Sequence, residues 1–293
     1  MRVLITGAAG QVGREVVAVL ERRAAERRRG PALEAVALGR DACDVARRDA
    51  VLAVVSGVEP DVVIHCAAFT AVDACESEPD RAYMVNALGT RHVAEAARRV
   101  GAHLVAVSTD YVFDGRSSQP YREWDAPHPL SVYGASKLGG ERECDPSATV
   151  VRTSWVCGRF GPNMAKTVLR LAAGEGPLRF VDDQHGSPTV AADLAEMLVT
   201  LGLERRPGLF HVTNTGATTW YGFARVVLAA AGGDPGRVEP IATGALVPPR
   251  PAPRPANSVL DNAALRLSGI ALLPAWEESV ARLIGELGMA AAP

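Results

Sequence analysis

The stretch "RVLITGAAGQVG", residues 2–13, predicts the fold of the first half of the chain. A short aliphatic run is followed at once by Gly7, Gly10 and Gly13, and then by a segment of helical character. A tight strand-to-helix turn of this kind places backbone N–H groups at a helix N-terminus, where the helix dipole favours a pyrophosphate. The spacing G-x-x-G-x-x-G differs by one residue from the G-x-G-x-x-G fingerprint, and in this context it predicts dinucleotide binding.

The pattern on either side of this turn predicts an α/β fold with a parallel, doubly wound sheet. Strands buried on both faces are expected at 2–6, 34–38, 61–65, 103–107 and 149–153, with helices near 12–28, 47–56, 78–100 and 133–144. The second half is less regular. It predicts strands at 177–181 and 209–213, helices near 163–173, 190–203, 219–231 and 276–287, and a rigid proline-rich surface loop at 247–257.

Composition excludes several classes of partner. With 293 residues and a net charge of −2, the chain gives no reason to expect nucleic acid or an anionic membrane. No apolar run approaches the roughly 20 residues of a membrane helix, and the N-terminus does not resemble a signal peptide. Five scattered cysteines without a C-x-x-C pair indicate free thiols in a reducing compartment, with no zinc site. We therefore expect a cytoplasmic protein.

The end of the second predicted strand bears on the choice of cofactor. An acidic residue there binds the ribose 2′-hydroxyl, whereas an arginine accommodates a 2′-phosphate. The chain reads "VALGRDACDV", with Arg40 at the tip, Asp41 next and Asp44 three residues further on. Arg40 favours NADPH and Asp41 leaves NADH open, while Arg40 as an ordinary loop arginine is the alternative.

A second constellation predicts hydride-transfer chemistry. Tyr133 and Lys137 are four residues apart in a helical segment, so they share one face, although such pairs are common on helix surfaces. Thr109 ends the strand that precedes them, where ligands of a parallel sheet lie. We expect Tyr133 to give a proton to a carbonyl oxygen, Thr109 to orient that carbonyl, and Lys137 to hold the cofactor ribose and lower the tyrosine pKa.

At this point the chain resembles a known family. The glycines, Thr109 and the Tyr133–Lys137 pair are those of an extended short-chain dehydrogenase/reductase. The segments "STDYVFDG", "PYREWDAPHPLSVYGASKLGGE", "VRTSWVCGRFGPNMAKTVLRLA", "VDDQHGSPT" and "PRPANSVLD" are similar to the dTDP-4-dehydrorhamnose reductase family, in order, from residue 1 to about 285. The resemblance implies a Rossmann domain over 1–154 and a mainly sugar-nucleotide-binding domain over 155–293, parts of which return to the first. It also implies reduction of the 4-keto group of a dTDP-linked 6-deoxyhexose.

The resemblance also implies the contacts of each ligand by position. Cofactor contacts are expected, beside the catalytic pair, at Gly7, Gly10, Gln11, Val12, Gly13, Arg40, Asp44, Val45, Ala67, Ala68 and Thr70. Substrate contacts are expected at Val72, Asp110, Tyr111, Trp155 and Asn163. An aromatic floor for the sugar gives Trp155 a physical rationale.

Three positions depart from the family pattern or extend it. His65 stands where the family usually has asparagine, and we interpret it as a core histidine with satisfied hydrogen bonds rather than a proton carrier. Cys157 replaces a usual tyrosine near the expected sugar pocket, where a smaller side chain would change which sugar fits. Glu15 matches an acidic residue that some relatives use with Mg²⁺ at a dimer contact, with Asp193 as a conceivable partner. We favour a plain surface glutamate and predict no metal site.

Alternative functions remain open. Sugar-nucleotide dehydratases of the same superfamily place Asp-Glu directly after the catalytic threonine, whereas Asp110-Tyr111 follows here, which disfavours dehydration. A 4-ketoreductase of another dTDP-deoxysugar, and a non-catalytic NADP-binding subunit like that of methionine adenosyltransferase, keep the same motifs. The exact sugar, the choice between NADPH and NADH and a homodimeric state are not decided by the sequence.

Overall fold

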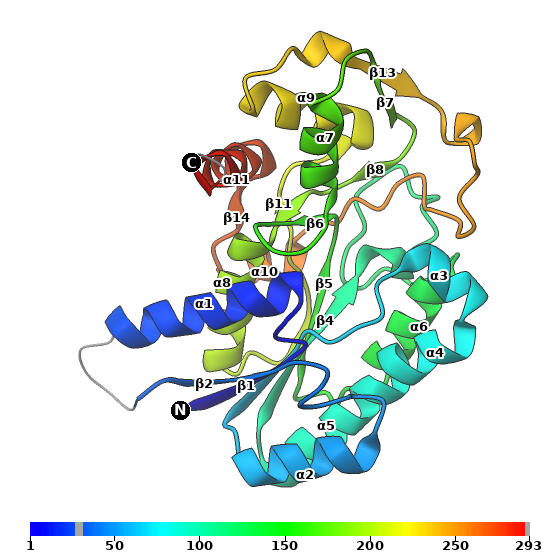
Figure 1. The fold of residues 1–293 in the computed structure, drawn as a ribbon. Coiled ribbons are helices and arrows are strands. Elements are labelled where there is room, and N and C mark those ends of the chain that lie inside the picture. The colour runs from blue at the N-terminus through cyan, green and yellow to red at the C-terminus, as the bar shows by residue number, and fades with distance from the viewer. Residues whose placement is uncertain (27–31, 291–293) are drawn as a thin grey trace.

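The centre of the molecule is a parallel sheet of six strands, in the order β10-β5-β4-β3-β1-β2 (Figure 1). The structure, a computed structural model, describes residues 1–26 and 32–290. The strands are β1 (Arg2–Thr6), β2 (Glu34–Leu38), β3 (Val62–His65), β4 (His103–Thr109), β5 (Thr149–Thr153) and β10 (Gly208–His211). Each adjacent pair runs parallel. The predicted doubly wound fold is therefore confirmed.

Helices cover both faces of this sheet, as Figure 1 shows. One face carries α1 (Gln11–Glu26) and α8 (Ala191–Leu203), which pack on Val3 and Ile5 of β1. The other face carries α2 (Arg48–Val58) and α5 (Gly89–Val100), which pack around Leu4. Alternate residues of β1 thus enter opposite cores, which explains why the strand is apolar throughout.

The strand order reverses between β1 and β3, because the chain goes from β1 outward to β2 and then returns to the other side of β1. Ligands of open α/β sheets bind at such a switch point, beyond the carboxyl ends of the strands. The glycine turn follows β1 and Thr109 ends β4, so the fold brings both predicted motifs to the same edge.

A second core lies beyond that edge, in the upper part of Figure 1. It is built mainly from α7 (Met164–Ala172), α9 (Trp220–Ala230), α11 (Trp276–Ala290), β7 (Leu178–Val181) and β13 (Val238–Ile241). Short elements complete the described chain: α3 (Val72–Ser77), α4 (Pro79–Tyr83), α6 (Val132–Glu141), α10 (Ala263–Leu267), β6 (Val156–Cys157), β8 (His185–Gly186), β9 (Thr189–Val190), β11 (Asn214–Thr215), β12 (Thr218–Thr219), β14 (Leu273–Ala275) and single turns η1 (Met84–Leu88), η2 (Asp110–Val112), η3 (Pro235–Arg237) and η4 (Thr243–Ala245).

Elements of the second half return to the Rossmann sheet. Strand β10 pairs with β5, and α8 packs against α1. The boundary at 154/155 between two functional domains stays a prediction.

Two sequence predictions about these elements were wrong. Strand β2 is not buried on both faces, because it lies at the sheet edge and two of its five residues are exposed. The helix expected over 78–100 is divided into α4, the π-helical turn η1 and α5. The π turn places Asn86 where its side chain bonds the backbone of Phe69 in both directions, at 2.8 Å and 3.1 Å. Residues 27 and 28 of the helix predicted near 12–28 lie outside the described residues.

Candidate active site

The glycine turn forms a cradle that a side chain would fill. Gly7 has φ = +67°, and a Cβ there would lie 2.5 Å from the backbone nitrogen of Ala67. A Cβ on Gly13 would lie 2.3 Å from the carbonyl oxygen of Gly7. Helix α1 begins at Gln11 and runs for 16 residues away from this turn. Bare backbone at the N-terminus of a long helix fits a dinucleotide pyrophosphate.

Two cavities meet at this cradle. The smaller, of about 250 Å³, includes in its wall Gly7, Gly10, Arg40, Asp44, Val45, Ala67 and Ala68. The larger, of about 600 Å³, includes Gly10, Gln11, Val12, Gly13, Ala68, Thr70, Thr109, Tyr133 and Lys137. The structure thus brings every predicted cofactor residue into the wall of one cavity or the other. Their binding roles stay predictions.

The tip of β2 presents a cationic group at the smaller cavity. The guanidinium of Arg40 lies 4.0 Å from the carboxylate of Asp44, and the Arg40 side chain is 72 % exposed. Asp44 is oriented by a hydrogen bond that it accepts from the backbone of Ala46 at 3.1 Å. The loosely held arginine is free to turn toward an anion in this cavity.

Helix α6 carries the Tyr133–Lys137 pair into the larger cavity. Ser131 caps the helix by accepting a hydrogen bond from the backbone of Gly134 at 3.1 Å, which begins the helix just before the tyrosine. The buried Lys137 donates from Nζ to the carbonyl oxygen of Val107 on β4 at 2.7 Å. That bond holds the ammonium group against the strand that ends in Thr109.

The charge states at this pair differ from one sequence prediction. Burial raises the pKa of Tyr133, and a hydrogen bond with Thr109 opposes that shift. The net shift is upward, opposite to the lowered tyrosine pKa that the sequence predicted. Burial also lowers the pKa of Lys137 itself, while Glu141 opposes that change. A raised phenol pKa keeps Tyr133 protonated at neutral pH, as a proton donor must be.

The far end of the larger cavity is aromatic. Trp155 adopts a left-handed backbone (φ = 46°) and stacks on Trp220 with ring centroids 3.5 Å apart. A Cβ on Gly186 would lie 2.4 Å from the Trp155 ring, so that glycine makes room for the stack. Val72, Asp110, Tyr111 and Trp155 all line this cavity, as predicted for substrate contacts. Trp220 was missed, because it lies 65 residues from its partner and in no motif that we used.

Two other predicted contacts lie outside the wall of the cavity. Asn163 caps α7 through Lys166 and donates to the side chain of Gln11 at 2.8 Å, so it touches a wall residue rather than the cavity. Cys157 is buried in the second core, with a pKa that burial raises to about 12. Cys157 therefore lies outside the cavity wall, and its expected effect on the choice of sugar stays a prediction.

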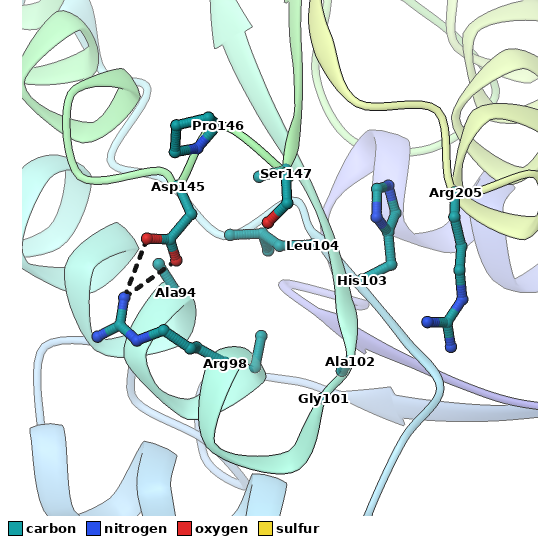
Figure 2. Close-up of a pocket in the computed structure, with 12 residues that line it drawn as sticks. Ala94, Arg98, Gly101, Ala102, His103, Leu104, Asp145, Pro146, Ser147 and Arg205 are labelled. Carbon is teal, nitrogen blue, oxygen red and sulfur yellow. Dashed lines mark hydrogen bonds and ion pairs between the residues drawn. The ribbon is translucent and has the colours of Figure 1, made fainter.

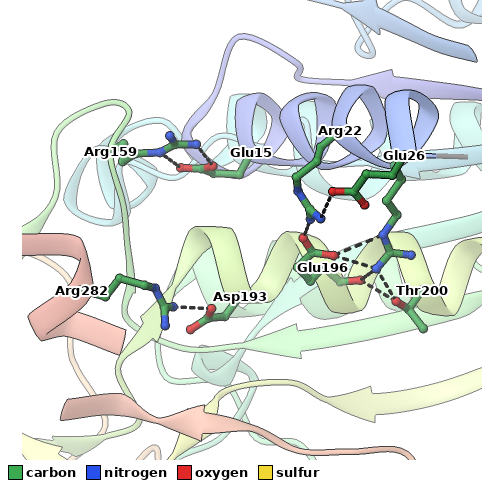
Figure 3. A network of polar contacts seen from close by, with 9 residues as sticks. Glu15, Arg22, Glu26, Arg159, Asp193, Glu196, Thr200 and Arg282 are labelled. Carbon is green, nitrogen blue, oxygen red and sulfur yellow. Dashed lines mark hydrogen bonds and ion pairs between the residues drawn. The ribbon is translucent and has the colours of Figure 1, made fainter. Parts of the chain in front are cut away.

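The surface interpretation of Glu15 was also wrong. Its carboxylate is buried and forms two hydrogen bonds with Arg159, at 3.0 Å and 2.6 Å (Figure 3). Asp193 pairs instead with Arg282 at 2.5 Å. Within residues 1–26 and 32–290, no three histidine, cysteine or acidic side chains gather where they could hold a metal ion. Glu15 is a buried ion-pair partner that joins α1 to the loop before α7.

His65 is a buried histidine with two partners, as the sequence predicted. Its ring nitrogens lie 2.7 Å from the hydroxyl of Thr6 and 3.2 Å from that of Thr90. Burial, aided by the charge of Lys137, lowers the pKa of His65 to about 3. The ring is therefore neutral in the folded protein near pH 6.5, where a histidine in an unfolded chain takes up a proton.

This neutral ring makes a prediction about acid stability. Because the folded pKa of His65 lies below the unfolded value, its contribution is lost as pH falls from about 6.5 toward 3. When the pH falls from 7.5 to 5, the free energy of unfolding should decrease by about 2 kcal/mol less in His65→Asn than in the unmodified protein. Urea unfolding at both pH values measures this. Replacing the exposed His185 in the same way should leave the acid loss unchanged, and an equal loss in His65→Asn would contradict the argument.

A third large cavity lies at the opposite edge of the sheet (Figure 2). Its wall includes His103 at the start of β4, Asp145 and Arg98, and these last two form an ion pair at 3.0 Å. His103 is bonded to Thr149 at 2.8 Å. No predicted site residue lies in its wall, so this cavity is separate from the candidate active site.

The switch point of the parallel sheet holds a glycine cradle, and one helix face in the adjoining cavity carries a tyrosine and a lysine. This is the arrangement of short-chain dehydrogenases/reductases. This chain is of that class. It belongs to the family described as RmlD substrate binding domain, which it matches over residues 1–289. The family resemblance predicted from the sequence is thereby confirmed.

Named relatives are similar over nearly their whole length. The chain is 44 % identical to the dTDP-4-dehydrorhamnose reductase of Streptomyces griseus, covering 98 % of this chain and 95 % of that protein. It is 43 % identical to a probable dTDP-4,6-dihydroxy-2-methyloxan-3-one 4-ketoreductase of Streptomyces antibioticus, covering 96 % and 93 %. The crystal structure of dTDP-4-dehydrorhamnose reductase from Bacillus anthracis in complex with NADP superposes with a TM-score of 0.90, at 38 % identity, covering 97 % and 99 %.

Proposed function

We propose that the protein is an NADPH-dependent reductase that converts dTDP-4-dehydro-L-rhamnose to dTDP-L-rhamnose by reducing its 4-keto group. The observation that carries this proposal is the cavity in which Thr109, Tyr133 and Lys137 lie between a dinucleotide cradle and an aromatic floor. The names of the Streptomyces griseus and Bacillus anthracis relatives support the substrate, and the NADP complex of the latter supports the cofactor. Arg40 at the smaller cavity supports NADPH over NADH.

The residues of the chain divide the work of the reduction. When bound in the glycine cradle, NADPH would supply a hydride for the carbonyl carbon. Tyr133, which is protonated at neutral pH, donates its phenolic proton to the carbonyl oxygen. Thr109 orients the carbonyl oxygen by a hydrogen bond. Lys137, held by its bond to Val107 in the same cavity wall, would bind the cofactor ribose.

The diphosphate of the substrate requires a cationic group near the sugar end. We propose that Arg254 and Arg250 provide it. Arg254 forms a two-bond pair with Asp73, one at 2.9 Å, and lies within hydrogen-bonding reach of Tyr111. Arg250 lies 3.6 Å from the same carboxylate. Two guanidinium groups share one carboxylate, so a net positive charge remains beside the cavity wall.

This assignment predicts a substrate-specific defect. Arg254→Gln should raise the KM for the nucleotide sugar by about 10–100-fold, because a charge-assisted contact to phosphate is lost. The KM for NADPH should be unchanged, and Asp73 keeps Arg250 as a partner. Arg98→Gln, which removes another arginine paired with a carboxylate at the opposite sheet edge, is the matched control. Equal effects on both KM values, or on both variants, would argue against a phosphate contact.

A second substrate is favoured by a specific observation. The Streptomyces antibioticus relative at 43 % identity has a different ketosugar in its name. We therefore test the function by NADPH oxidation with dTDP-4-keto-6-deoxyglucose, with and without a 3,5-epimerase. Turnover only with the epimerase supports dTDP-4-dehydrorhamnose as substrate, and turnover without it supports a D-sugar 4-ketoreductase. NADPH binding without turnover in either case would favour a different ketosugar or a non-catalytic subunit.

The setting of the enzyme is a further part of the proposal. We infer a cytoplasmic location, which the five unpaired cysteines support. Among the described helices, none combines the length and the apolar character that a membrane crossing requires. We propose a homodimer, which light scattering tests.

A further inference from the structure

Asp110 is a buried carboxyl group in the wall of the candidate active site. Its side chain is 2 % exposed, and it follows Thr109 directly at the end of β4. One carboxyl oxygen lies 3.0 Å from the Thr109 hydroxyl, and the other accepts a hydrogen bond from Ser154 at 2.9 Å. The mechanism above gives Asp110 no part, so the reason for a buried acid beside a catalytic hydroxyl requires a separate account.

The Thr109 hydroxyl has only one proton to donate. Its oxygen already accepts a hydrogen bond from the backbone of Tyr111 at 3.2 Å. When it donates to Asp110 across the 3.0 Å contact, that proton is not available to a substrate carbonyl or to the phenol of Tyr133, which also lies within its reach. An ionised carboxylate can only accept, whereas a protonated carboxyl group can donate to the threonine oxygen instead.

Burial favours the protonated form of Asp110, whereas hydrogen bonds from the neighbouring hydroxyls favour the ionised form. Thr109 of β4, Ser154 after β5 and Ser258 of the C-terminal region bond it with neutral hydroxyls. The titratable groups that face it are the phenols of Tyr111 in η2 and Tyr133 in α6, and Arg254 acts on Tyr111. Burial raises the pKa of Asp110 to about 6, and the three hydroxyl bonds oppose that rise.

We propose that Asp110 is a positioning residue that decides where the Thr109 hydroxyl points, and that its protonated form permits reduction. This inference rests on the proposed reductase function. With Asp110 ionised, the Thr109 proton is held by the carboxylate. With Asp110 protonated, the acid donates to Thr109 Oγ1, and Thr109 donates its own proton to the substrate carbonyl oxygen as a hydrogen bond. No covalent bond of Thr109 is broken, and the hydrogen bond between Asp110 and Thr109 only reverses its direction.

The test is the pH profile of kcat/KM between pH 5.5 and 7.5. For the unmodified protein we expect kcat/KM to fall as pH rises, by up to about 25-fold if only the protonated form reacts. Asp110→Asn should flatten the profile, because its amide nitrogen donates to Thr109 at every pH. Asp114→Asn, the same change four residues away, should keep the unmodified profile. A flat profile in the unmodified protein, or an unchanged fall in Asp110→Asn, would overturn the proposal.

Two further variants separate positioning from structure. In a Thr109→Val background, Asp110→Asn should change the profile no further, because Asp110 acts through the hydroxyl that is missing. Ser154→Ala removes one bond that lowers the pKa of Asp110 and should move the fall to higher pH. If Asp110→Asn does not fold, the shift of the pH profile in Ser154→Ala tests the proposal instead. An unshifted profile in Ser154→Ala refutes it.

An infrared pH titration of the carboxyl stretch reads out Asp110 without turnover. If the unmodified protein reduces none of the nucleotide sugars, the proposed function fails. The inference about Asp110 is overturned separately by either of two results. One is that no carboxyl group titrates in the same pH range, and the other is that such a group disappears in Asp114→Asn but not in Asp110→Asn.

Discussion

Replacing Tyr133 with phenylalanine should reduce turnover by about 10²–10⁴-fold, the range expected when a general acid is removed. The phenol lies in the cavity with Thr109 and Lys137, and it is protonated at neutral pH. Phenylalanine retains the ring that packs edge-on against Tyr111 at 5.8 Å, so the wall of the cavity keeps its shape. The loss should therefore appear in kcat, while the Kd for NADPH changes little.

The measurement is steady-state NADPH oxidation together with cofactor binding by fluorescence. Tyr83→Phe is the matched control, since that tyrosine lies half exposed on α4 and outside both ligand cavities. It should keep the activity of the unmodified protein. Undiminished turnover in Tyr133→Phe would refute the assignment of the acid, and a loss confined to NADPH affinity would give the tyrosine a binding role instead.

The second large effect is expected at the glycine cradle. Gly13→Ala should weaken NADPH binding by about 100-fold or more, equivalent to about 3 kcal/mol. The new Cβ would lie 2.3 Å from the carbonyl oxygen of Gly7 and 2.7 Å from the Cα of Ala8. Both are backbone atoms, so no flexible side chain can move aside, and the turn itself must shift away from the cofactor phosphates.

Cofactor titration calorimetry measures this loss, and thermal unfolding shows whether the fold survives. Gly57→Ala in α2 is the control, because nothing lies within 4 Å of its new Cβ. That substitution should leave NADPH affinity unchanged and stabilise the protein by up to about 1 kcal/mol. A Gly13→Ala variant that binds NADPH normally would show that the turn does not approach the phosphates closely.

The sequence patterns predicted the sheet well, because strand runs and turn residues are local features. The bounds of β1, β2 and β5 coincide with the runs that we expected. Period and composition do not tell where a strand lies in the sheet, however. The run at 34–38 looks as apolar as its neighbours, and only the pairing order shows that β2 is an edge strand.

The candidate site was predicted in the same uneven way. Motif residues at strand ends and on one helix face came together as expected, because the carboxyl ends of parallel strands share one edge. Asn163 and Cys157 lie outside the cavity wall, since a position near a motif can serve as a helix cap or face away from the cavity on a short strand. Asn86, which joins Phe69 to Ser136, was missed because a π turn has no sequence signal that we used.

The sequence by itself determined the doubly wound fold, the glycine turn, the Tyr133–Lys137 spacing and the family, since each depends on residues close together or on motifs in order. The stack of Trp155 on Trp220, the burial of Glu15 against Arg159 and the contact of Asp110 with Thr109 appear only in the folded chain. Such contacts depend on burial and on which distant elements meet. A chain pattern does not record these, because the free energy of a buried charge is set by all of its neighbours in space.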